Sequence, residues 1–123
     1  MPYEIVKTKS LKATASLATS QFCFVTLDAN GQIVLPSAGA YCEGVLQDKP
    51  GAGDPGAVCY PGDITRVVVG TGGVTAGADV ATDASGHAVA VTSGAYILGQ
   101  ALETQATSGN IATILYQPKG SHS

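Results

Sequence analysis

One segment of twenty residues occurs twice in this chain of 123 residues. Residues 25–44 read VTLDANGQIVLPSAGAYCEG and residues 80–99 read VATDASGHAVAVTSGAYILG. A shift of 55 positions places nine of the twenty residues opposite an identical residue, whereas chance in a Gly- and Ala-rich chain gives about two. A solenoid usually needs at least three stacked units. The repeat therefore predicts two halves of one closed β-domain.

Each copy contains a D-A-x-G turn. Asp28 and Asp83 are expected to accept backbone N–H groups within the turn, because short acidic side chains cap such bends. Gly31 and Gly86 are expected to take positive φ, which glycine adopts without a Cβ penalty. These residues are predicted to be corners of a scaffold, one set in each half.

Each copy also contains a Gly-Ala-Tyr corner. We expect Tyr41 and Tyr96 to place their rings over the adjoining apolar face. With one inserted residue the correspondence continues to the pair Tyr60 and Tyr116, so the predicted halves span about 25–60 and 80–116. Both halves should use the same order: strand, turn, strand, corner, strand, loop, strand.

Short strand signals separated by turns dominate the rest of the chain. FCFVTL and QIVL flank an Asn-Gly turn, ITRVVV precedes GTGG, and IATILY ends before Pro118. Residues 47–57, rich in Pro and Gly, read as a loop. No long window has apolar residues at helical spacing. The predicted class is all-β: a small single-domain β-barrel or sandwich, with an internal two-fold sequence repeat and an extended N-terminal arm.

The predicted organisation has three parts. Residues 1–16 form the extended arm, because MPYEIVKTKSLK gives way to small polar residues without an apolar stripe. Residues 17–118 form a single β-domain that contains both halves, and residues 119–123 form a disordered tail.

Composition excludes several classes of partner. Hydrophobic residues make up 45% of the chain and charged residues only 12%, about half the usual charged fraction, so much of the surface is expected to meet other protein. Net charge is −3 and the six cations form no dense patch, which argues against nucleic acid. No signal peptide or apolar span is evident, so neither secretion nor a membrane partner is predicted.

No residue pattern predicts catalysis. The two histidines accompany no G-x-S-x-G nucleophile motif, and His87 stands beside a turn. Cys23, Cys42 and Cys59 lack metal or disulfide spacing and are expected to be reduced and buried. We therefore predict no enzyme; an enzyme that uses aspartates and His87 is a remote alternative.

No cofactor or metal is predicted either. VVVGTGGVTAG does not continue into a phosphate-binding loop and reads as a β-turn. Asp48, Asp54 and Asp63 surround the Gly/Pro loop without EF-hand spacing and read as solvated acids.

From about residue 44 to 118 the chain resembles a known family. GVLQD, a Gly/Pro loop and then GDITRVVVGTGGVTAGADVATDASGHAVAVTSGAYILGQALETQATSGNIATILYQP are similar to the small phage capsid cement, or head decoration, proteins. The resemblance lies in the order and spacing of simple elements. It implies a β-rich subunit that binds the outer surface of an assembled phage head, often as a trimer at local threefold positions, and stabilises the capsid.

The same resemblance implies that the N-terminal arm reaches the major capsid protein. Tyr3, Ile5 and Val6 are the predicted apolar anchors. Lys7, Lys9 and Lys12 are predicted to meet acidic capsid residues. A frayed, solvated N-terminus is the alternative.

The expected localisation is the virion, on the outer capsid surface, after synthesis in the host cytoplasm. The alternative function is a virion-surface receptor- or glycan-binding β-module. Such modules usually stack sugars on exposed aromatic rings, whereas this chain has no Trp and only seven Phe and Tyr residues. Of these, only Tyr3 is expected to be clearly exposed.

Overall fold

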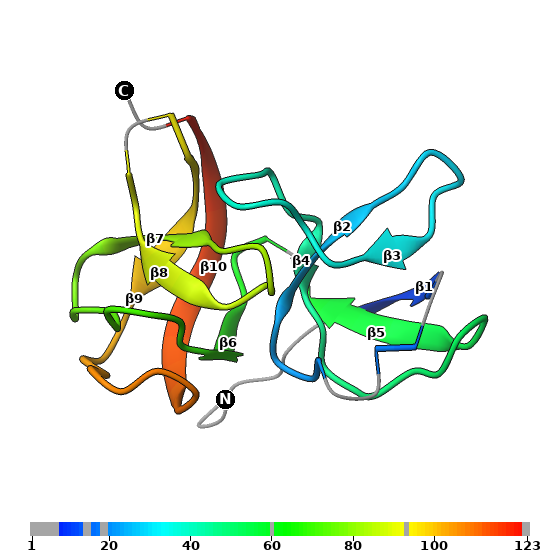
Figure 1. Cartoon of the computed structure of the whole chain (residues 1–123), viewed down its shortest axis with the longest axis horizontal. Coiled ribbons are helices and arrows are strands. Elements are labelled where there is room, and N and C mark those ends of the chain that lie inside the picture. Colours follow the sequence, from blue (N-terminus) through cyan, green and yellow to red (C-terminus); the bar gives the residue numbers. More distant parts are fainter. Residues whose placement is uncertain (1–7, 14–15, 18–19, 60, 93, 122–123) are drawn as a thin grey trace.

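Ten β-strands and no helix make up the described part of the chain (Figure 1). The computed structural model describes residues 8–13, 16–17, 20–59, 61–92 and 94–121. The predicted all-β class is confirmed. Within these residues, no helix has the length and apolar character needed to cross a membrane.

The strands fall into two halves that lie side by side in Figure 1. The N-terminal half comprises β1 (Thr8–Lys12), β2 (Phe24–Leu27), β3 (Ile33–Val34), β4 (Gly44–Val45) and β5 (Pro55–Cys59). The C-terminal half comprises β6 (Ile64–Val68), β7 (Asp79–Thr82), β8 (Ala88–Ala90), β9 (Tyr96–Ala101) and β10 (Ile111–Ser121).

Three open antiparallel sheets connect these strands. Their orders are β1-β5, β3-β2-β4 and β6-β10-β9-β7-β8. A closed barrel, which was one of the two predicted architectures, is absent from the described strands.

Part of the pairing pattern recurs in both halves. β2 lies between β3 and β4, and β7 lies between β8 and β9. β1 pairs with β5 as β6 pairs with β10. Two residues outside the strands form isolated parallel bridges: Ala13 with Ile33 of β3, and Val69 with Ala88 of β8.

The two predicted turns are built alike. In each, the aspartate Oδ1 accepts the backbone N–H groups two and four residues further on, at 2.8 and 3.0 Å for Asp28 and at 2.9 Å twice for Asp83. Gly31 has a φ of 75° and Gly86 a φ of 79°. The local predictions for these four residues are confirmed.

Two clusters of buried side chains form the interior. The first belongs to the N-terminal half alone and contains Ala13, Leu17, Val25, Ile33, Leu46 and Val58, with Leu11 packed against it. The second draws on both halves and contains Phe24, Cys42, Val45, Cys59, Val67, Val69, Val74, Val80, Ala88, Leu98, Ala101, Ala112, Ile114 and Tyr116. The C-terminal half therefore completes its core with side chains from the N-terminal half.

The two ends of the fold extend further than the sequence pattern indicates. Within the predicted arm, Thr8–Lys12 forms β1 and pairs along its length with β5, and Ala13 is buried. At the other end β10 continues past Pro118 to Ser121, with an irregularity in its pairing with β9 between Tyr116 and Gly120. A proline lacks the N–H of a regular ladder and is accommodated at such irregularities.

Candidate functional site

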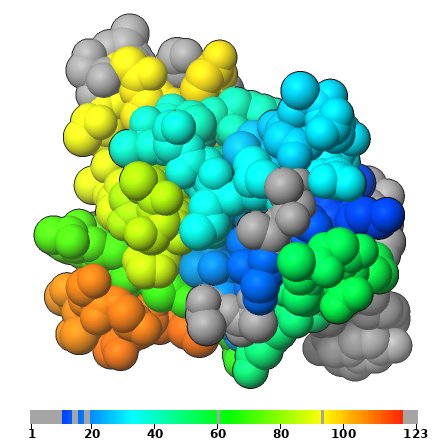
Figure 2. Space-filling model, turned by 45° about the vertical axis from the view of Figure 1, so that its right-hand side comes forward, coloured from blue at the N-terminus to red at the C-terminus, as the bar shows by residue number. Residues whose placement is uncertain are grey.

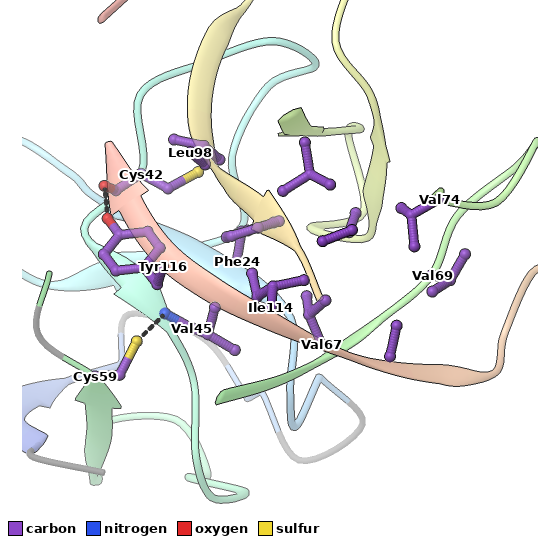
Figure 3. Close-up of a cluster of buried hydrophobic side chains, with 14 residues drawn as sticks. Phe24, Cys42, Val45, Cys59, Val67, Val69, Val74, Leu98, Ile114 and Tyr116 are labelled. Carbon is purple, nitrogen blue, oxygen red and sulfur yellow. Dashed lines mark hydrogen bonds between the residues drawn. The ribbon is translucent and has the colours of Figure 1, made fainter. Parts of the chain in front are cut away.

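The junction between the halves is an apolar contact. Phe24, Cys42, Val45 and Cys59 are fully buried, and all four belong to the core cluster of the C-terminal half (Figure 3). The Val45 N–H also contacts the Cys59 sulfur, at 3.3 Å. The removal of this surface from water holds the halves together.

Tyr116 on β10 ties this junction to the far end of the sequence. Its ring lies 6.3 Å from that of Phe24, centroid to centroid, and its hydroxyl donates a 2.6 Å hydrogen bond to the Cys42 carbonyl (Figure 3). Burial is the main cause that raises the pKa of Tyr116. The hydroxyl therefore serves as a fixed donor inside the junction.

The two Gly-Ala-Tyr corners meet at the surface of the same junction. The Gly39 N–H donates to the Thr82 carbonyl, and the Tyr96 N–H donates to the Gly39 carbonyl. The rings of Tyr41 and Tyr96 lie edge to face, with centroids 5.8 Å apart and planes at 77°. Figure 2 shows the cyan chain of the N-terminal half lying against the yellow-green chain of the C-terminal half.

Both corner tyrosines are exposed, which corrects the prediction that Tyr3 alone is clearly exposed. The exposed fraction is 46% for Tyr41 and 38% for Tyr96. The sequence repeat does not show that the two corners meet each other.

A cavity of about 370 Å³ adjoins these corners. Its walls come from the 38–39 segment of the N-terminal half and from β7, β8 and the 92–95 segment of the C-terminal half. Most lining residues are Ala or Gly; Asp83, Thr82 and Thr92 supply polar groups. Two N–H bonds to Oδ1 fix the Asp83 carboxylate, and His87 Nδ1 lies 3.9 Å from Asp83 Oδ2.

The predicted capsid-binding residues are only partly placed. Tyr3, Ile5, Val6 and Lys7 lie outside the described residues. Lys9 and Lys12 lie on β1, opposite Val58 and Pro55 of β5, and the Lys12 side chain is exposed.

Cys23, Cys42 and Cys59 are buried, as predicted. Burial raises the pKa of Cys23 to about 11 and that of Cys42 to about 12. Thiols held in the neutral form are poor nucleophiles. Chemically, these residues contribute apolar packing.

The described acidic and histidine side chains do not gather into a metal site. Within the described part of the chain, no three His, Cys, Asp or Glu residues are placed to share a metal ion. Asp48 instead accepts a hydrogen bond from the Ala57 N–H, at 3.1 Å. The arrangement as a whole provides contact surfaces: an aromatic pair, a cavity lined mainly by small residues, and the exposed Lys12 on β1.

Comparison with known proteins gives a similarity of fold. No protein-family model matches the sequence, and no curated protein matches it. A solved structure that it resembles is the crystal structure of the head fiber gp8.5 N base in bacteriophage phi29, with a TM-score of 0.69 and 18% sequence identity. The similarity covers 96% of this chain and 100% of that chain.

Proposed function

We propose that this protein is a structural component of a phage virion, associated with the head. The observation that carries the proposal is the similarity in fold to the head fiber base, which extends over nearly the whole chain. The low charged fraction supports it, because a surface with few charges is suited to contact with other protein subunits. The proposed role is structural rather than catalytic.

More specifically, we propose a decoration subunit that binds the outer surface of the assembled head and stabilises it. Its partners would be the major capsid protein and other copies of itself, as a homotrimer at local threefold positions. Three linked copies bind together, so weak contacts by each subunit yield strong attachment overall. Exposed Leu27, Leu35, Leu102 and Ile111 offer apolar surface for such contacts.

The proposed capsid contact lies at the N-terminus. Tyr3, Ile5 and Val6 would supply apolar anchors, and Lys7, Lys9 and Lys12 would face acidic groups. β1 supports this arrangement, because its pairing with β5 holds the exposed Lys12 on a framework rather than on a free end.

We also infer that the two halves are copies of one folding unit. The shared turns, the shared strand neighbours and the two parallel bridges, Ala13–Ile33 and Val69–Ala88, support this inference. In this view β1 is the counterpart of β6.

Cosedimentation with phage heads that lack the protein tests the main proposal. The full chain should saturate such heads, and removal of residues 1–7 should weaken binding while β1 stays intact. Lys12→Ala should weaken binding by about threefold and reduce its dependence on salt. Lys49→Ala is the matched control, because Lys49 is also exposed but lies outside the proposed contact.

Failure of the full chain to cosediment would reject the head-surface role. If the chain without residues 1–7 binds normally, and if Lys12→Ala and Lys49→Ala bind equally well, the N-terminal contact is rejected. The head-surface role is not rejected by that result. Sedimentation analysis of the free and the head-bound protein tests the trimer. If the protein is a monomer in both states, the trimer is rejected.

A further inference from the structure

The exposed pair Tyr41 and Tyr96 is the starting point. An edge-to-face pair uses the face of one ring and the edge of the other. With exposed fractions of 46% and 38%, the two side chains retain much of their aromatic surface for a ligand. Aromatic rings of this kind stack against the C–H faces of sugar rings, and the tyrosine hydroxyls remain available for hydrogen bonds.

The neighbouring cavity has the size of a small-ligand site. Its volume of about 370 Å³ lies near the lower end of the range of roughly 300–1,000 Å³ for ligand pockets. Ala95 and Gly94 line it and precede Tyr96 directly, and Gly39 lines it two residues before Tyr41. The Tyr96 N–H bond to the Gly39 carbonyl joins these two segments. The segments that carry the two tyrosines therefore also form walls of the cavity, although neither ring is part of its lining.

The polar groups of the cavity favour hydroxyl donors. Asp83 is about one-third exposed, and its carboxylate is oriented by the two N–H groups that Oδ1 accepts. An ionised carboxylate only accepts hydrogen bonds, so it suits hydroxyl groups and repels anions. The rest of the lining is mainly Ala and Gly, with Val89.

We propose that Tyr41, Tyr96 and the adjoining cavity with Asp83 bind a neutral oligosaccharide. One sugar ring lies against the tyrosine rings, and the hydroxyls of a neighbouring sugar donate to Asp83. This goes beyond the proposed structural role, and it does not require the protein to be on a head. A single site of this kind binds weakly, and several copies on one particle would raise the overall affinity.

Saturation-transfer NMR on the full, free chain tests the proposal. The probes are maltohexaose, cellohexaose and chitohexaose, with sialyllactose as an anionic control. We expect at least one neutral probe to bind and sialyllactose not to bind. Tyr96→Ala should weaken binding by about tenfold, which corresponds to about 1.4 kcal/mol.

Two further variants separate stacking from general damage. Tyr96→Phe keeps the aromatic ring and should retain binding. Leu102→Ala removes another exposed side chain, which does not line the cavity, and should leave binding unchanged. Circular dichroism establishes that each variant is folded.

The proposal is overturned if no neutral probe binds or if Tyr96→Ala binds as well as the unaltered chain. If no neutral probe binds and the Tyr41→Ala/Tyr96→Ala double variant also loses cosedimentation with heads, the tyrosine pair docks on protein instead of sugar. Each of these outcomes leaves the head-surface role to be judged by the cosedimentation of the unaltered chain.

Discussion

Gly31 and Gly86 have the same backbone conformation but different surroundings. A Cβ added at Gly31 would meet no atom within 4 Å, whereas one added at Gly86 would lie 2.5 Å from the Phe24 carbonyl oxygen. The first turn is open to solvent, and the second is pressed against the junction between the halves.

This difference predicts unequal effects of the same substitution. Gly31→Ala should lower the free energy of unfolding by about 1 kcal/mol, through the positive φ alone. Gly86→Ala should cost about 2–4 kcal/mol, because strain and a backbone clash add. Urea unfolding of the two variants measures this, and equal losses would contradict the packing of Gly86 on Phe24.

Single residues also show what sequence patterns can reveal. The roles of Asp28 and Asp83 were predictable because each carboxylate acts within its own turn. The exposure of Tyr41 and Tyr96 was not, because it depends on where two distant corners meet. The sequence argument against an aromatic sugar platform relied on these rings being covered.

At the level of strands, β4 and β9 show how similar elements acquire different surfaces. Each contains a glycine that is followed by a residue of contrasting burial: Val45 is fully buried at the junction, while Gln100 is partly exposed and donates to the Gly77 carbonyl. In β4 the residue after the glycine is apolar and is covered at the junction, whereas in β9 it is polar and partly exposed.

Exchanging these residue types tests the contrast. Val45→Gln should lower the free energy of unfolding by about 1–3 kcal/mol, because it buries an amide at an apolar contact. Gln100→Val should change it by no more than about 0.5 kcal/mol. Thermal and urea unfolding provide the values, and a harmless Val45→Gln would refute the buried junction.

Strand β1 was not predictable from its own residues. TKSLK contains one apolar residue, so it has no alternation, and its partner β5 begins at Pro55 inside a segment that reads as a loop. Backbone pairing between the two segments and the burial of Ala13 create the strand. By contrast, β2 and β6 carry apolar residues in the pattern of strands and were expected.

For the molecule as a whole, the buried thiols make the free energy of unfolding depend on pH in the alkaline range. Burial raises the pKa of Cys42 from 9.0 to about 12 and that of Cys23 to about 11, so the folded state holds protons that the unfolded state releases. Their contribution to stability is fully present below pH 9 and is lost progressively as the pH rises toward 11–12.

We therefore expect the free energy of unfolding to fall with pH above 9 in the presence of a reductant. Cys42→Ala should reduce this slope by up to about 1.4 kcal/mol per pH unit. Urea unfolding at several pH values between 8 and 10 measures the slope. An identical slope in the variant would show that Cys42 is not held protonated by the fold.

The two core clusters also indicate the order in which the two halves fold. Every member of the first cluster lies between residues 11 and 58, so this core can close while the rest of the chain is still being synthesised. The second cluster is complete only after Tyr116 has been synthesised, because Tyr116 belongs to it. The Tyr116 hydroxyl also donates to the carbonyl of Cys42, which lies 74 residues earlier in the chain. We expect the N-terminal half to fold first, as it leaves the ribosome, and the C-terminal half to fold afterwards against its surface.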